Sequence, residues 1–401
     1  MRFEWLGAEK ALRALWIPLA LLIAAPWPMM GWPIAERAVP IFFLIAGGLL
    51  LCMGRVARAS WPLACLILWA GLRAGYHNFQ LRSLQVLLLM TMAALLYAAA
   101  RDLSDGMTRL AAIAAAIGIG YELVLGTLNS FGIYPWMAWV DPLQLGKPMG
   151  LLTHPNYWGS FVALGIPILW SVAGIPVVAI AFLLILRTIS GGPVISASVG
   201  ILVMAWPLFS RRVRYAVVTL GVASTAVVMT LHEWRLSGRR EIWEVAVPEA
   251  WRWKFIGQGL GEWRTWSDQY NGIKGRFFVT LQAHNEPLQL WFELGLIGLV
   301  LGALIAWQAY RAARTVWMAA PAGRLPSPWY AWGRAPLERA WPAILAVAAV
   351  NMLGSPVFHL PGQAALILLA LARCQADAAS LTAGAPAEAT PPQRAPTRRK
   401  R

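Results

Sequence analysis

Residues 288–307 read LQLWFELGLIGLVLGALIAW, a run in which Glu293 is the only ionisable side chain. A helix needs about 20 mostly apolar residues to cross the hydrocarbon core of a bilayer, and this run is long enough. Similar runs recur along the 401-residue chain, which is 59% hydrophobic and 13% charged, with a mean hydropathy of +0.57. One soluble core cannot bury that much apolar surface. The sequence therefore predicts an all-α, polytopic integral membrane protein.

Apolar runs of this kind predict about twelve transmembrane helices. Their central parts are residues 12–30, 39–53, 62–75, 84–100, 110–128, 157–170, 172–186, 194–209, 215–231, 288–307, 341–357 and 362–372. The first run follows basic residues, as in a signal peptide, but no small-x-small cleavage site follows it, so it is interpreted as a membrane helix. The sixth and seventh runs are separated by the turn-forming Gly174-Ile175-Pro176.

The distribution of positive charge gives these helices a direction. With the N-terminus in the cytoplasm, 21 of the 34 Lys and Arg residues fall in cytoplasmic segments, as the positive-inside rule requires. Eight others fall in one long loop, residues 232–285, which is then periplasmic. Because topology accounts for most of the net charge of +16, nucleic-acid binding is not expected.

Two regions are predicted. Residues 1–373 form a transmembrane domain with the periplasmic loop 232–285. Residues 374–401 are rich in Ala, Pro, Thr and Arg and are expected to be a disordered cytoplasmic tail, whose basic end contacts membrane lipids.

The basic residues of the periplasmic loop are candidates for binding an anion. They are Arg235, Arg239, Arg240, Arg252, Lys254, Arg264, Lys274 and Arg276. Positive charge placed outside, against the topological preference, favours an anionic partner such as phosphate, which matches the arginine fork. A mixed, solvated face is the alternative, since the loop also contains acidic residues.

Two motifs lie within this loop. Ser237 to Glu244 resembles the start of a short amphipathic helix with Arg239 and Trp243 on one face, where Trp243 could equally be an interfacial anchor. The alternating glycines of Gly257-Gln258-Gly259-Leu260-Gly261 are interpreted as a tight turn. A dinucleotide site is not expected, because no strand precedes these glycines.

The end of the loop places a histidine at a helix N-terminus. Asn285 is a good N-cap, so the tenth membrane helix is predicted to begin there, immediately after His284. The positive helix end favours a neutral His284 that can accept a proton, although a structural hydrogen-bonding role is the alternative. Glu286, Gln289 and Glu293 form a polar stripe, and Glu293 is expected to face the bundle.

Two further residues are expected on the same side. His154 precedes the sixth helix and could bind substrate or cap that helix, and Arg187 lies between the seventh and eighth helices, where snorkelling is the alternative. Five scattered histidines and three cysteines show no metal-ligand spacing or disulfide framework, so no metal or other cofactor is expected.

These motifs together resemble the O-antigen ligase and polymerase superfamily of bacterial envelope glycosyltransferases. The matching pieces are Gly238-Arg239 with Trp243, the glycine run 257–261, His284-Asn285 leading into Glu293-Leu294-Gly295, and an upstream His154-Pro155-Asn156. They match in order and spacing over about residues 151–299. Family members often carry a Ser-Arg pair where this chain has Ser190-Gly191-Gly192-Pro193, and Arg187 is the candidate to replace that arginine.

The resemblance implies a location, a substrate and a set of roles. The protein would lie in the bacterial inner membrane with both termini cytoplasmic. It would transfer a glycan from undecaprenyl diphosphate to a hydroxyl of lipid A-core or another glycan acceptor at the periplasmic face, without a metal. His284 would activate or orient the acceptor, and Arg239 would hold the diphosphate. Arg240, Arg187, His154, Asn285, Glu293 and Trp243 would complete the substrate site.

Three alternatives stay open at the level of sequence. A polymerase of the same superfamily would join repeat units to each other. A transporter or flippase of lipid-linked glycans would use a basic vestibule without forming a bond. A catalytically inactive scaffold would tolerate replacement of both His284 and Arg239.

Overall fold

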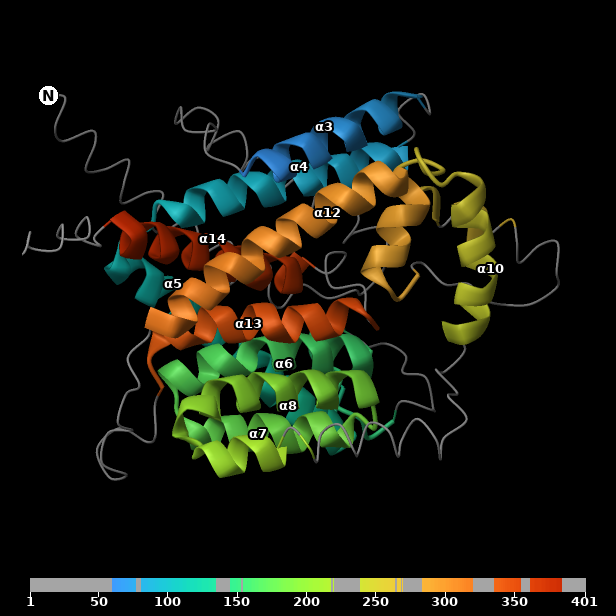
Figure 1. Cartoon of the computed structure of the whole chain (residues 1–401). Helices are drawn as coiled ribbons and strands as arrows, with labels where there is room; N and C mark the ends of the chain where they lie inside the picture. The colour runs from blue at the N-terminus through green and yellow to red at the C-terminus, as the bar shows by residue number, and fades with distance from the viewer. Residues whose placement is uncertain are drawn as a thin grey trace, which may run out of the picture.

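The computed structural model describes residues 60–76, 81–134, 145–152, 154–217, 219, 239–263, 265–267, 269, 283–319, 335–354 and 361–383. Within these ranges every regular element is a helix (Figure 1). The main elements are α3 (Trp61–Tyr76), α4 (Leu81–Arg101), α5 (Asp105–Ser130), η3 (Gly150–Leu152), α6 (Pro155–Val172), α7 (Ile175–Arg187), α8 (Gly191–Ala205), η4 (Trp206–Leu208), α10 (Arg239–Arg252), α12 (Glu286–Ala319), α13 (Leu337–Met352) and α14 (Pro361–Ala383). The predicted helices 12–30 and 39–53, and most of 215–231, lie outside the described residues.

Among the described residues, four helices are long enough and apolar enough to cross a membrane: α5, the continuous α8–η4 segment, α12 and α14. Each apolar run predicted between residues 62 and 209, and each one after residue 287, coincides with a helix. The all-α prediction is therefore confirmed for the described residues.

Helix ends follow local chemistry, and two predicted boundaries are wrong. Gly174, with a φ of 91°, separates α6 from α7 as expected. However, α13 ends at Met352 rather than near residue 357, because Gly354 and Pro356 follow and neither favours continuation of a helix. The tail prediction also fails at its start, because α14 continues to Ala383. Arg373 stabilises this extension by pairing with Asp377 at 2.6 Å; residues 384–401 lie outside the described residues.

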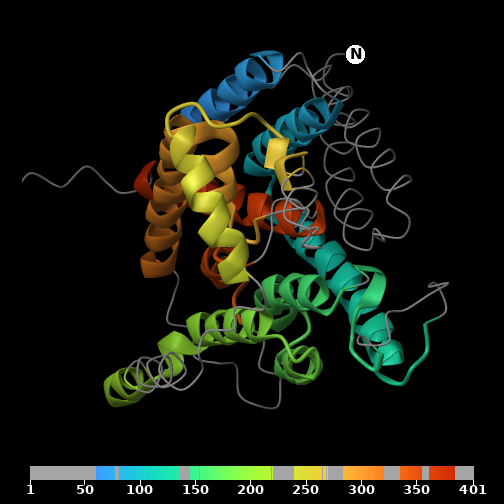
Figure 2. The same ribbon diagram turned by 90° about the vertical axis from the view of Figure 1, so that its right-hand side faces the viewer.

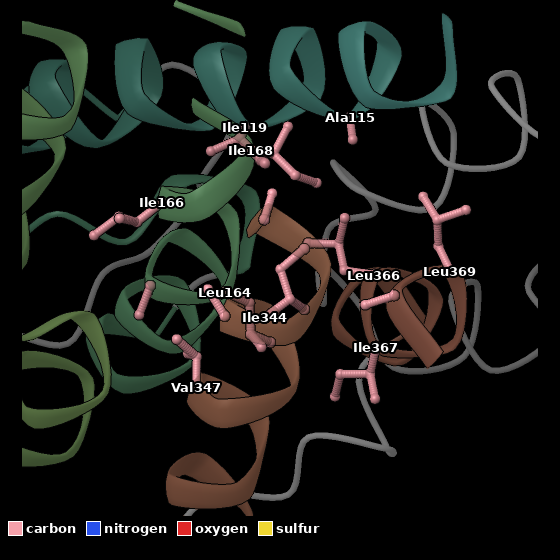
Figure 3. Packing of buried hydrophobic residues seen from close by; sticks show 14 of the residues in the cluster. Ala115, Ile119, Leu164, Ile166, Ile168, Ile344, Val347, Leu366, Ile367 and Leu369 are labelled. Carbon is pink, nitrogen blue, oxygen red and sulfur yellow. The ribbon is translucent and has the colours of Figure 1, made fainter. Parts of the chain in front are cut away.

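The main hydrophobic core lies where α5, α6, α13 and α14 meet. Figure 3 shows Ile119 of α5 facing Ile168 of α6, with Ile344 of α13 and Leu366 of α14 on the other side. An added Cβ on Gly165 would lie 2.5 Å from the Ile119 side chain. Such close approach of α5 and α6 is typical of helix packing through small residues.

Helix α10 runs across the ends of the bundle rather than along it. In Figure 1 α3, α13, α6 and α8 extend in a common direction, whereas α10 crosses their right-hand ends, and Figure 2 views that end directly. Its buried face, Ala246 and Ala250, packs on Phe292 of α12 and on Trp263. The loop that the sequence singled out therefore carries a helix that covers one end of the bundle.

Helix α12 bends sharply at Gly295, where the backbone leaves helical geometry with φ 67° and ψ −166°. The segment before Gly295 lies beside α10, and the segment after it follows the bundle (Figure 1). The sequence predicted a single membrane helix through this point, residues 288–307, and did not predict the bend. Glu293 therefore precedes the bend, in the part of α12 that packs against α10.

The glycine run 257–261 holds this bend in place. Gly257, Gly259 and Gly261 all have positive φ, which confirms the predicted tight turn. The turn donates backbone hydrogen bonds from Gln258 to Phe292 at 2.8 Å and from Gly259 to Glu293 at 3.0 Å. These bonds satisfy carbonyls that the bend removes from the helical ladder.

Replacing Gly295 by alanine is expected to destabilise the fold strongly. The added Cβ would lie 2.3 Å from the Phe255 carbonyl oxygen, at a φ of 67° that other residues rarely adopt. Backbone strain and overpacking each cost about 1–3 kcal/mol. The thermal unfolding temperature of the purified protein should fall clearly. Gly120→Ala is the matched control, since nothing lies within 4 Å of its added Cβ. Equal unfolding temperatures for the two variants would contradict this account of the bend.

Candidate functional site

Four side chains from three separate parts of the chain converge beside the N-terminal end of α10. His154 precedes α6 and Tyr157 lies in its first turn, with 4.9 Å between the two ring centroids. Arg239 begins α10, and His284 lies two residues before α12. The charge of Arg239 acts on both histidines, and His154 acts on His284, so these groups are neighbours in space. The structure thus brings together three of the residues that the sequence selected.

The C-terminal end of α13 forms one wall of this cluster. An added Cβ on Gly354 would lie 3.2 Å from Nη1 of Arg239. Asn285 donates from Nδ2 to the Leu353 carbonyl at 3.4 Å and accepts from the Leu288 N–H at 2.9 Å. The predicted N-cap is therefore confirmed, and Asn285 also ties the start of α12 to the end of α13. Carbonyls at a helix C-terminus favour a cation such as Arg239 nearby.

Polar contacts near the cluster join α6, α8 and α13 to one another. Asn351 of α13 accepts from Ser196 of α8 at 2.6 Å and donates to the Ser160 carbonyl of α6 at 3.4 Å. Ser190, before α8, donates to Oδ1 of Asn156. Since buried polar groups need partners, these contacts set the relative positions of α6, α8 and α13.

His284 has an unusual backbone and an unpaired ring nitrogen. Its φ is 53°, in the left-handed region that costs a residue other than glycine about 1–3 kcal/mol and that clusters at functional sites. Its buried Nδ1 has no hydrogen-bond partner in the described part of the chain. A buried polar atom without a partner costs free energy, and a ligand hydroxyl could provide that partner.

Burial makes both histidines neutral at physiological pH. It lowers the pKa of His284 to about 4, with further lowering by the positive charge of Arg239. It also lowers the pKa of His154, again helped by Arg239 and by Lys147. Nδ1 of His154 accepts the Asn156 N–H at 3.2 Å, so the neutral ring carries its hydrogen on Nε2 and can donate it.

Arg239 is the principal positive charge of the cluster. Burial lowers the pKa of its guanidinium, and Tyr157 opposes that shift, but an arginine stays protonated. Across the described ranges no carboxylate is within salt-bridge distance of Arg239. A half-buried arginine beside two neutral histidines is an arrangement suited to an anion.

A chain of hydrogen bonds links the cluster to the glycine turn. Trp243 donates from Nε1 to the Ala283 carbonyl at 2.9 Å, and the Ala283 N–H donates to Gln289 at 3.1 Å. Gln289 donates to Glu293 at 3.1 Å, and Glu293 accepts the Gly261 N–H at 3.0 Å. Trp243 therefore positions Ala283, the residue before His284. Glu293 positions the glycine turn that packs against the bend.

Replacing Trp243 by phenylalanine should weaken this support without removing ring packing. Loss of the bond to the Ala283 carbonyl costs about 1 kcal/mol. The unfolding temperature should fall modestly, and any activity that depends on His284 should fall with it. Trp251→Phe is the control, since that ring is 62% exposed. If both variants unfold and react like the wild type, Trp243 does not support His284.

For three of the predicted site residues, no contact in the described part of the chain joins them to the cluster. Arg187 is exposed at the end of α7 and donates to the Ser130 carbonyl at 3.3 Å. Glu293 belongs to the hydrogen-bonded chain at the glycine turn. The backbone of Arg240 lies in α10, and its side chain is outside the described residues.

The sequence analysis missed one residue of the cluster, Tyr157, and one residue of its wall, Gly354. Tyr157 lies three residues after His154, so a helix beginning at Pro155 puts both on one side, and this spacing could have revealed it. Gly354 could not be found in this way, because only the packing of α13 brings it to Arg239. No group of three or more His, Cys, Asp or Glu in the described ranges could hold a metal ion.

Comparison with known proteins does not assign the chain to a family. No protein-family model matches the sequence, and no curated protein matches it significantly.

Proposed function

We propose that this protein is an O-antigen ligase-like glycosyltransferase of the bacterial inner membrane, with about twelve transmembrane helices and the cluster on the periplasmic side. Its donor is a glycan on undecaprenyl diphosphate, and its acceptor is a hydroxyl of lipid A-core or another glycan. The observation that carries the proposal is the convergence of Arg239 with neutral His284 and His154 where several helix ends meet.

The chemistry of glycan transfer fits these groups. The acceptor oxygen bonds to the anomeric carbon while the bond from that carbon to the diphosphate oxygen breaks. The diphosphate leaves with the electron pair, and its charge is stabilised by Arg239. The hydroxyl proton passes to His284, which is neutral and whose Nδ1 is unpaired in the described part of the chain. His154, with its hydrogen on Nε2, can donate to the diphosphate or to a sugar oxygen.

No step of this scheme requires a metal, because Arg239 and the positive N-terminal end of α10 supply charge for the leaving group. Arg240 remains a secondary proposal for a diphosphate contact, whereas Arg187 donates to the Ser130 carbonyl and is not assigned this role. Asn285 orients the start of α12 beside the acceptor.

A gene deletion followed by lipopolysaccharide electrophoresis tests the proposal in cells. Loss of a ligase removes every glycan chain attached to lipid A-core. Loss of a polymerase of the same superfamily leaves a band with a single repeat unit. An unchanged ladder would contradict both versions.

A further inference from the structure

A run of exposed apolar side chains lies at the end of α10 that is remote from Arg239. Trp251, Trp253, Phe255 and Ile256 are 62%, 46%, 59% and 38% exposed. This run is not part of the cluster around His284. Four large apolar side chains exposed within six residues are a candidate interaction surface.

Basic groups accompany the aromatic rings in this patch. Lys254 lies with Nζ 5.2 Å from the Trp251 ring centroid and 5.3 Å from that of Phe255. Exposed Arg252 pairs with Glu249 at 2.8 Å. Aromatic rings combined with lysine are typical of the interface between hydrocarbon and water, where the rings meet the glycerol region and the ammonium meets phosphate.

The patch is level with the point where α12 enters the bundle. The Leu296 N–H donates to the Lys254 carbonyl at 2.7 Å, directly after the bend at Gly295. Leu296, Ile297 and Val300 are exposed and continue the apolar surface along α12. From the bend to its end at residue 319, α12 is about 36 Å long. The hydrocarbon core is about 30 Å thick, so the segment after the bend is by itself long enough to cross it.

A second helix carries the same pattern at the same level. Trp69 of α3 donates to the Leu294 carbonyl at 2.8 Å, beside the bend. One turn later exposed Tyr76 marks the end of α3, while Leu68 and Leu72 face outward. Arg73, 5.0 Å from the Tyr76 ring, is buried and donates to the Gly257 carbonyl at 2.9 Å, so it ties α3 to the glycine turn. Aromatic groups at one height on two elements, accompanied by Lys254 and Arg252 on the first, form a belt such as membrane proteins place at the headgroups.

We infer that the run Trp251–Ile256 is immersed in the phospholipid headgroup layer of the membrane that α12 crosses. This patch anchors one end of α10 in lipid, while the other end carries Arg239. The inference does not depend on the proposed glycosyltransferase activity.

Site-directed spin labelling tests this inference. Cys52, Cys65 and Cys374 are replaced by alanine, and Phe255→Cys is labelled with a nitroxide in full-length protein. Vesicles contain phosphatidylethanolamine and phosphatidylglycerol. Val300→Cys serves as the lipid-facing reference, and Glu241→Cys, exposed at the other end of α10, as the aqueous reference. Collision with oxygen and with a water-soluble nickel chelate is measured by power saturation.

The label at residue 255 should collide with oxygen several-fold more, relative to the nickel chelate, than the label at residue 241. The ratio of oxygen collision to nickel-chelate collision at residue 255 should lie between the ratios at residues 241 and 300. A ratio equal to that at residue 241 would place the patch in water and overturn the inference. Protection from both reagents would mean that protein covers the patch, as in a dimer, and would also overturn it. Trp253→Cys repeats the test at a second exposed position.

Discussion

Replacing His284 by alanine is expected to reduce glycan transfer by about 10²- to 10⁴-fold, the range typical of losing a general base. The substitution removes the neutral imidazole that accepts the hydroxyl proton, while the Asn285 cap and the bend at Gly295 are retained. The unfolding temperature should therefore change little or rise, because alanine also removes a buried nitrogen without a partner in the described structure. An active His284→Ala enzyme would exclude the proposed base.

The same residue predicts an unusual dependence on pH. Because the pKa of His284 is lowered to about 4, its neutral form dominates from physiological pH down to that value. The acid limb of kcat/KM should accordingly fall as pH decreases through about 4, rather than near 6.5, the ordinary value for histidine. A limb at 6.5 that disappears in His284→Ala would contradict the burial described for this side chain.

Replacing Arg239 by alanine should reduce kcat/KM by about 10²- to 10³-fold, since one preorganised group that stabilises developing charge is lost. Arg239→Lys should recover only part of this loss, because an ammonium keeps the charge but lacks the planar fork. Binding of inorganic pyrophosphate to the purified protein, followed by calorimetry, provides a readout independent of turnover.

Arg187→Ala is the matched control for Arg239. Both are arginines on the same side of the molecule, but Arg187 is exposed and bonds to the Ser130 carbonyl. Its replacement should leave pyrophosphate binding close to that of the wild type. An equal loss in both variants would show that Arg187 belongs to the site, as the resemblance in sequence had implied.

Much of the helical framework follows from local sequence. Apolar runs gave helix positions because a helix buries or exposes to lipid nearly all of its side chains. The cap at Asn285 and the tight turn at Gly257, Gly259 and Gly261 could be predicted, because capping and positive φ both depend on residue type.

The bend at Gly295 was missed because hydropathy carries no information on backbone torsion. A glycine inside an apolar run also has the ordinary role of close packing between helices. The bend depends on the turn at residues 257–261, which packs against it from another part of the chain.

The sequence predicted several residues of the site, but it did not predict how they are arranged in space. Charge and capping selected His154, Arg239 and His284 separately, but only the packing of α6, α10 and α12 makes them neighbours. The same packing separates Glu293 from them. The resemblance implied a substrate contact for Glu293, whereas Gln289 and the backbone N–H of Gly261 donate to its carboxylate.

The most direct test of the central claim uses purified protein in phospholipid vesicles with an undecaprenyl diphosphate-linked glycan and lipid A-core. Mass spectrometry measures the glycan joined to the acceptor and the undecaprenyl diphosphate released. The wild-type protein should form both products in equal amounts, and His284→Ala should form almost none. Movement of the lipid-linked glycan between leaflets without a new glycosidic bond would contradict the account, as would equal product from both proteins.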